Sequence, residues 1–250
     1  MTECGQLRVD GGTTVDLWRA GLTRVPEQVW ERRESRVLIL ADNALTGLPP
    51  RIGRLRRLRT LDLGHNALTS LPEEIGELTG LDGCLYLHDN RLTALPRSLG
   101  RLRSLAYLNV GDNSLGALPE EIGGIAGLVE LRAQRCGLRE LPASLGRLTA
   151  LRELWLRGNA LVSLPASLSR LRELREVELR ENALEEVPGA LRGLPRLRRL
   201  DLRGNRLRTV PRWLGRELPA LEKLDLRWNG TAVDPGLVEE LERRGCVVLR

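Results

Sequence analysis

The 250-residue sequence contains no phenylalanine, one lysine and few aromatic residues, since Phe, Trp and Tyr together make up 3% of the chain. A hydrophobic core therefore has to be built almost entirely from leucine and other aliphatic side chains. Lys223 is the one lysine among many arginines, alanines and glycines, a bias that indicates a GC-rich, bacterial genome. The same bias accounts for the net charge of +6.

Long apolar runs and paired cysteines are also missing. No stretch approaches the roughly 18 apolar residues of a membrane span, and the start, MTECGQLRVDGG, lacks the apolar stretch of a secretory signal. We therefore expect a cytoplasmic protein without membrane association. The cysteines Cys4, Cys84, Cys136 and Cys246 form no CxxC pair, so neither a zinc site nor a local disulfide framework is predicted.

What the sequence does contain is a repeat. Asparagine recurs every 23 or 24 residues, or at a multiple of that interval, and proline recurs in phase with it from Pro26 to Pro235. The asparagine ladder consists of Asn43, Asn66, Asn90, Asn113, Asn159, Asn182, Asn205 and Asn229, with Cys136 at the midpoint of its one gap. Two ladders in phase predict about ten similar structural units.

Two of these units show the shared pattern. The unit from Leu151 reads LRELWLRGNALVSLPASLSRLRE, and the unit from Leu58 reads LRTLDLGHNALTSLPEEIGELTG. From about Val15 to the C-terminus, this LxxLxLxxNxLxxLPxxIGxL pattern resembles the leucine-rich-repeat family, especially the 23-residue units of intracellular plant and Ras-associated scaffold proteins and their bacterial relatives. The resemblance implies an α/β right-handed solenoid, or horseshoe, with a parallel β-sheet on the concave face and short helical or irregular segments on the convex face. It also implies protein binding, and a structural role for Cys136, because the family accepts cysteine at this place.

Local physics gives the same picture. The alternation at residues 154–156 puts leucine inward and Trp155 outward, as a short strand requires. Each ladder asparagine can satisfy backbone groups where the chain turns out of the strand. Proline, followed four residues later by glycine or serine, predicts a tight helical turn on the convex side. The two longer units, near Gly83 and near Glu217, should bulge locally while their strands stay in register.

The ends of a solenoid need caps. Asp234 and Pro235 have the properties of an N-cap and a first helical position, and residues 247–249 could add a last strand, so we expect a capping helix and strand over 234–249. At the other end, the segment that ends in Val29 and Trp30 should shield the core. We expect an N-terminal segment, 1–14, and a single repeat domain, 15–250.

Candidate binding residues lie beside the core leucines on the predicted concave face. Its middle carries Tyr86, His88, Tyr107, Arg132 and Trp155. Exposed Trp and Tyr beside Arg are typical of protein interfaces, although incidental surface residues are the other interpretation. Arg157, Arg180 and Arg203 continue toward the C-terminus, beside an acidic row that includes Glu178 and Asp201. Either these arginines bind a partner, or the two rows neutralise each other; both interpretations stay open.

The N-terminal half of the face is acidic, with Asp16, Asp42, Asp62, Asp89 and Asp112 against Arg19 alone. This charge would steer a basic partner, and the lack of continuous positive charge argues against nucleic acid. His65, His88 and Asp89, with Asp42 and Asp112 further out, could in principle hold a divalent metal, but polar residues on an open turn are the simpler interpretation. No HExxH, phosphate-loop or GxSxG motif occurs, so we expect no metal, no cofactor and no catalysis.

The sequence thus predicts a monomeric, non-catalytic scaffold, of a kind used in signalling, that binds a protein partner on its concave face. Two alternatives remain: a regulatory or structural subunit of a separately encoded enzyme, and a bacterial effector that binds a host protein.

Overall fold

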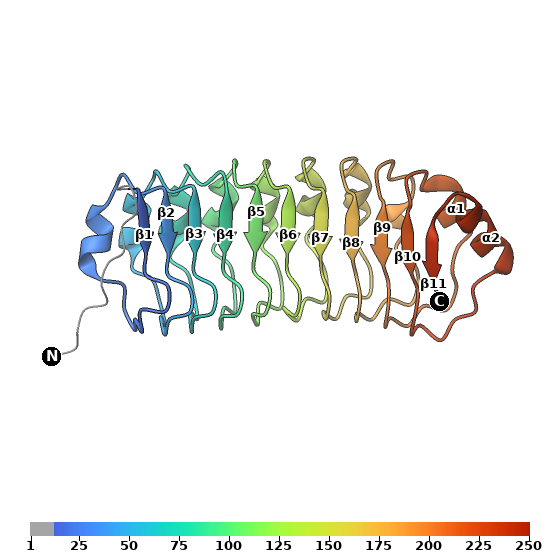
Figure 1. Ribbon diagram of the computed structural model, residues 1–250, viewed down its shortest axis with the longest axis horizontal. Coiled ribbons are helices and arrows are strands. Elements are labelled where there is room, and N and C mark those ends of the chain that lie inside the picture. Colours follow the sequence, from blue (N-terminus) through green and yellow to red (C-terminus); the bar gives the residue numbers. More distant parts are fainter. Residues whose placement is uncertain (1–12) are drawn as a thin grey trace.

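The computed structural model describes residues 13–250, which form an elongated stack of similar coils (Figure 1). Each coil contributes one short strand to a single layer, turns, and returns on the other side of that layer. Residues 1–12 of the predicted N-terminal segment, Cys4 included, lie outside the described residues. The architecture is the right-handed α/β solenoid that the repeat pattern predicts.

Within residues 13–250, eleven strands form one parallel sheet in which spatial order equals sequence order. They are β1 Thr14–Asp16, β2 Val37–Ile39, β3 Thr60–Asp62, β4 Cys84–Tyr86, β5 Tyr107–Asn109, β6 Glu130–Arg132, β7 Glu153–Trp155, β8 Glu176–Glu178, β9 Arg199–Asp201, β10 Lys223–Asp225 and β11 Val247–Leu249. Because every strand pairs with its counterpart in the next coil, equivalent residues form columns that run along the sheet. Neighbouring residues in one column are about 4.8 Å apart.

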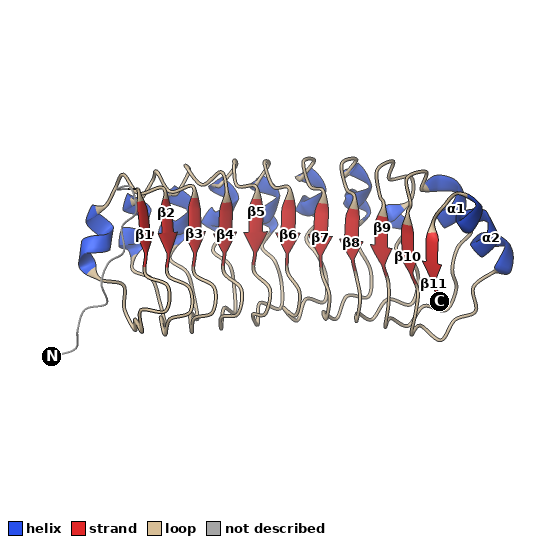
Figure 2. Cartoon of the chain, viewed as in Figure 1, coloured by secondary structure: helices blue, strands red, loops and turns tan. Residues whose placement is uncertain are grey.

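Short helices lie on the far side of the sheet in the view of Figure 2. In the described part of the chain, eight of them are 3-10 helices: η1 Glu27–Glu31, η2 Pro50–Arg54, η3 Glu73–Glu77, η4 Arg97–Arg101, η5 Glu120–Gly124, η6 Ala143–Arg147, η7 Ala166–Arg170 and η8 Gly189–Leu191. The α-helices α1 Trp213–Glu217 and α2 Pro235–Arg243 follow. None of the helices in residues 13–250 has the length and apolar character that a membrane span requires.

Leucine fills the space between the two layers. In one coil, Leu154, Leu156, Leu161, Leu168 and Leu171 are all completely buried. The same positions are buried in the other internal coils, so the core is continuous along the stack. The core is thus almost entirely aliphatic, as predicted, with Trp30 as its aromatic member.

The convex glycines have a different role from the predicted one. Gly76, Gly100, Gly123 and Gly146 have ordinary φ angles, so a tight turn does not require them. Instead, a Cβ atom at Gly123 would lie 2.5 Å from the Ser144 backbone oxygen of the next coil. Glycine is needed there because successive 3-10 helices pack backbone against backbone, not because the turn itself demands a glycine conformation.

The two longer units behave differently from each other. At the first, the pairing of β3 with β4 begins at Leu61 and Leu85. The Gly83 amide donates a hydrogen bond to the Arg59 carbonyl, so the extra residue is absorbed just before the strand. At the second, the 3-10 helix is replaced by the α-helix α1. In both places the neighbouring strands stay in register, as predicted.

Both ends of the stack are covered. Val29 and Trp30 of η1 are buried at the N-terminal end. At the C-terminal end, the Asp234 side chain accepts a hydrogen bond from the Gly236 amide and α2 begins at Pro235. Leu237 and Leu241 of α2 are buried against the last coil, and β11 follows as the final strand.

Candidate functional site

The asparagine ladder connects neighbouring coils. The Asn182 amide donates to the carbonyl of Leu179 in its own coil and to that of Leu156 in the preceding coil, both at 3.0 Å. Its oxygen accepts from the Leu161 amide of the preceding coil at 3.1 Å. Buried backbone groups that the turn leaves without partners are satisfied in this way. The ladder is therefore structural and takes no part in the open surface.

Cys136 replaces this amide incompletely. Its thiol lies 3.2 Å from the Val110 oxygen and 3.4 Å from the Gln134 oxygen, where an asparagine would donate. It supplies no acceptor for the Leu115 amide, which has no hydrogen-bond partner among residues 13–250. Burial raises the pKa of Cys136 to about 12. The thiol therefore stays protonated and unreactive at neutral pH.

The residue before each ladder position has a backbone constraint that the sequence analysis missed. In this column φ is positive in every coil from Arg19 to Trp228. Asn, Asp and Gly tolerate this left-handed conformation best. Asp42, Asp89 and Asp112 therefore fit a backbone requirement, and their presence is weak evidence for an acidic, partner-steering surface.

The remaining charge of the N-terminal half is also partly neutralised. Asp42 accepts a hydrogen bond from the Trp18 indole at 2.7 Å, and this bond is the main reason why its pKa is lowered. Asp112 forms an ion pair with Arg135 of the next coil. The net charge counted from the sequence thus overstates the field that a partner would meet.

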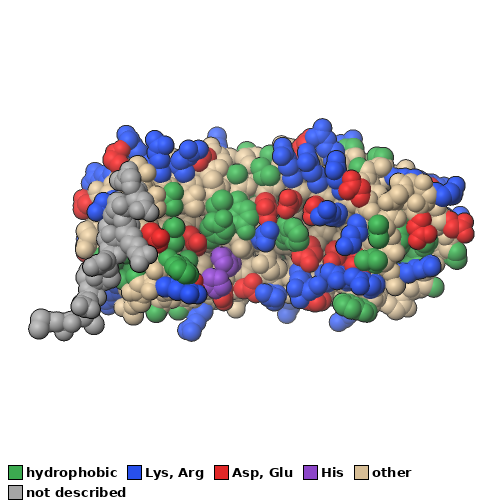
Figure 3. Space-filling model, in the orientation of Figure 1, with side chains coloured by type: hydrophobic (Ala, Val, Ile, Leu, Met, Phe, Trp, Pro, Cys, Tyr) green, Lys and Arg blue, Asp and Glu red, His purple; other side chains and the backbone are tan. Residues whose placement is uncertain are grey.

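The middle of the sheet face carries a continuous row of aromatic and arginine side chains. The rings of Tyr86 and Tyr107 are 5.0 Å apart. The Arg132 guanidinium lies 5.8 Å from the Tyr107 ring and 5.1 Å from the Trp155 ring. Figure 3 shows hydrophobic side chains gathered over the middle strands, with the histidines beside them. The structure therefore brings these four predicted residues together; we call Tyr86, Tyr107, Arg132 and Trp155 the central row.

The central row is half-buried and well ordered by its neighbours. All four side chains are partly covered, whereas the sequence analysis takes Trp155 to be exposed. The Trp155 indole donates to Glu153 at 3.2 Å, and Arg132 donates to Glu130 at 2.5 Å. Side chains held in this way lose little further conformational freedom when a partner binds.

His88 adjoins the row through Tyr86, with ring centroids 6.0 Å apart, and it also contacts His65. Burial, and then the nearby His65, lowers the pKa of His88, so the ring is neutral at pH 7. His65 bonds to Asp89 at 2.6 Å. Within residues 13–250 no three His, Cys, Asp or Glu side chains are arranged to hold a metal ion.

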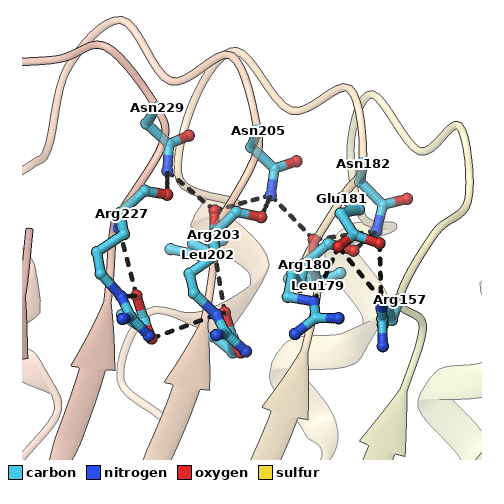
Figure 4. Close-up of polar contacts among 12 residues, drawn as sticks. Arg157, Leu179, Arg180, Glu181, Asn182, Leu202, Arg203, Asn205, Arg227 and Asn229 are labelled. Atoms are coloured by element: carbon cyan, nitrogen blue, oxygen red, sulfur yellow. Dashed lines mark hydrogen bonds and ion pairs between the residues drawn. The ribbon is translucent and has the colours of Figure 1, made fainter.

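The predicted arginine row is tied to carboxylates (Figure 4). Arg157 and Arg180 both pair with Glu181, at 3.0 and 3.2 Å. Arg203 pairs with Asp201 at 2.7 Å and with Asp225 at 3.3 Å. The Arg180 and Arg203 side chains are only 17% and 19% exposed. Of the two open interpretations, mutual neutralisation describes these contacts better.

A groove of about 240 Å³ lies beside the central row, across strands β7 to β10. Its lining includes Trp155, Glu176, Glu178, Arg199, Asp201, Arg203, Lys223 and Asp225. Aromatic, acidic and basic groups meet there on a partly enclosed surface. Such a surface suits an extended chain or a single protruding side chain better than a flat protein face.

Trp228 is a candidate contact residue that the sequence pattern did not single out. Its side chain is 70% exposed and its φ is +60°, a conformation that is rare for a bulky residue. The Arg227 guanidinium lies 5.7 Å from its ring. A large exposed aromatic that gains nothing from burial is a candidate contact residue. The signal in the sequence is its place in a column otherwise filled mostly by small or polar residues.

Comparison with known protein families agrees with this architecture. A family profile described as leucine-rich repeat region matches residues 83–190. Two further profiles, both described as leucine rich repeat, match residues 187–230 and 57–78. No curated protein sequence matches the chain.

Solved structures give the same result at the level of the fold. The Leptospira interrogans LRR protein LIC12759 is 29% identical with a TM-score of 0.82, over 92% of this chain and 63% of that one. PEPR1, from the crystal structure of PEPR1-AtPEP1, is 27% identical with a TM-score of 0.77, over 98% and 36%. The plant peptide hormone receptor RGFR1, in complex with RGF2, is 28% identical with a TM-score of 0.55, over 94% and 47%. The chain thus spans less than two thirds of each of these proteins.

Proposed function

The chain is a leucine-rich-repeat protein, and we propose that it is a non-catalytic scaffold that binds a protein partner on the concave face of its sheet. The fold itself implies a capacity for protein–protein interaction. The observation that carries the finer proposal is the central row, in which four large side chains stand in contact on an open face that does not need them for its core.

The chemistry of the row supports this function. Tyr, Trp and Arg are the residues that contribute most to binding energy at protein interfaces. Among the similar structures, RGFR1 is a plant peptide hormone receptor in complex with RGF2, and PEPR1 is likewise in a complex, with AtPEP1. An open face also excludes water poorly, which favours binding over catalysis.

The test is capture of interacting proteins from a lysate of the source organism. The wild-type protein is compared with a Tyr86→Ala, Trp155→Ala double variant and with a control variant, Val162→Ala, which removes an exposed apolar side chain elsewhere. Equal melting temperatures establish that all three are folded. We expect one protein to be retained by wild type and control and lost by the double variant.

If all three capture the same proteins, the central row is not the binding surface. When the captured protein is an enzyme, its activity with and without the scaffold separates a regulatory subunit from a passive scaffold. The affinity of the captured protein for wild type, for the double variant and for the control variant can then be measured directly.

A further inference from the structure

Glu178 lies in the column that continues the central row. The strand register places it between Trp155 on β7 and Asp201 on β9. Its side chain is half-buried and lines the groove. A carboxylate in this position meets an aromatic neighbour on one side and a like charge on the other, and neither neighbour can neutralise it.

Four arginines around Glu178 are engaged with other carboxylates. Arg157 and Arg180 pair with Glu181, as described above. Arg203 is held between Asp201 and Asp225, and Arg199 pairs with Glu176 at 3.2 Å. The Glu178 side chain forms no hydrogen bond or ion pair within residues 13–250. Burial, and then the charge of Asp201, raises the pKa of Glu178, as expected for a carboxylate without a partner.

Trp155 borders the same groove. Arg132 reaches its ring from the β6 side, whereas the other residues that line the groove come from β8, β9, β10 and the turn after β9. The contact between Arg132 and Trp155 shows that this indole accepts a guanidinium group as a neighbour. The groove side offers a second approach to the indole, next to an unpaired carboxylate.

We propose that the groove binds the guanidinium group of an arginine side chain in an extended segment of the partner, which pairs with Glu178 and packs against Trp155. The inference rests on the proposed function and names the chemistry of one contact. A planar guanidinium cation satisfies both neighbours at once, because it can donate two parallel hydrogen bonds to the Glu178 carboxylate and stack on the Trp155 ring. A neutral side chain lacks the charge that pairs with Glu178, and an acidic side chain would be repelled by it.

The experiment uses the full chain and two peptides, acetyl-Ala-Arg-Ala-amide and the same peptide with citrulline, which has the same shape without the charge. Binding is followed through the indole N–H signal of Trp155 in 1H–15N NMR spectra, assigned with Trp155→Phe. We expect the arginine peptide to shift this signal saturably and the citrulline peptide to leave it unchanged. Glu178→Gln should weaken the binding about tenfold.

Asp62→Asn is the matched control, because Asp62 occupies the same column on β3, far from Trp155. It should bind the arginine peptide as wild type does. Equal binding of both peptides, no saturable shift, or undiminished binding by Glu178→Gln would each overturn the arginine site. If the arginine site is overturned but the Tyr86→Ala, Trp155→Ala variant still loses a captured partner, binding on the concave face stands and only this inference fails.

Discussion

At the scale of single residues, the structure separates polar side chains that build the coil from those that are free to act. The side chains of the ladder asparagines form hydrogen bonds with backbone groups. The residues directly before them are constrained by a left-handed backbone conformation. The Glu178 side chain is held in neither of these ways. A residue type seen in the sequence is thus informative about function only after its backbone role is known.

Cys136→Asn should stabilise the protein. The new amide would accept from the Leu115 amide, which has no partner among the described residues, and would donate where the thiol does so weakly. One buried hydrogen bond gained is worth about 1 kcal/mol in the free energy of unfolding, measured by urea denaturation. Cys136→Ala provides the comparison and should be destabilised. An unchanged Cys136→Asn variant would mean that the coil has already relaxed around the cysteine.

Glu178 should make stability depend on pH. Because its pKa is raised in the folded state, that state binds the proton more tightly than the unfolded chain does. The resulting destabilisation is present above the folded pKa and disappears as the pH falls to the unfolded value of about 4.3. Glu178→Gln should therefore raise the melting temperature at pH 7 and have little effect near that lower pH.

Glu181→Gln should change the melting temperature at pH 7 in the opposite direction. Its hydrogen bond with Arg157 lowers the pKa of Glu181, so the carboxylate contributes stability at neutral pH that is lost as the pH falls through the folded pKa. The variant should melt below wild type at pH 7, with the difference closing in acid. Differential scanning calorimetry of both variants over this range checks both signs, and parallel curves would contradict the assignment.

At the scale of elements, the coil is a strand and a short helix whose spacing is set by contact with the next coil. The 3-10 helices from η3 to η7 pack side by side on the convex layer. Glycine permits this approach, and the extra residue near Glu217 converts the last such turn into α1.

Gly123→Ala should destabilise the stack, because the added Cβ meets the Ser144 backbone oxygen at 2.5 Å. Overpacking of this kind costs about 1 to 3 kcal/mol, read from the urea midpoint. Gly189→Ala is the matched control: it also lies in a 3-10 helix, with nothing within 4 Å of the added atom and an ordinary φ. Similar losses in both variants would argue against helix-to-helix packing as the cause.

At the scale of the whole molecule, each coil contacts mainly its two neighbours. Surface charge follows the same rule, since Arg51 pairs with Glu27, Arg57 with Glu34 and Arg192 with Glu217 of adjacent coils. Exposed pairs add little stability each. Cohesion therefore comes from the continuous leucine core and depends on covered ends.

Leu241→Ala should loosen the C-terminal end first. Leu241 is completely buried in α2, and a cavity there costs about 2 to 5 kcal/mol. Hydrogen exchange should show lost protection in β10 and β11 while β5 and β6 keep theirs. Leu131→Ala, in the middle strand β6, should instead lower protection on both sides. Equal loss throughout in both variants would indicate a single cooperative unit.

Much of this architecture follows from the sequence alone. The spacing of leucine, asparagine and proline determines the strand, the turn and the return of each coil, because each of these is a local consequence of side-chain period and backbone chemistry. The same spacing makes the columns of the sheet face calculable, so the contacts within the central row were predictable as neighbours in adjacent strands.

What only the tertiary structure decided concerns distances between coils and the competition among charges. Whether a convex glycine serves a turn or a close approach depends on the next coil, which lies 23 residues away in sequence. Which carboxylate each arginine selects depends on side-chain geometry that a column of letters does not contain. The sequence therefore determined the coil and the columns of the sheet face. Tertiary packing determined that the Glu178 side chain is left unpaired beside Trp155, because ion pairing depends on the positions of all neighbouring charged groups together.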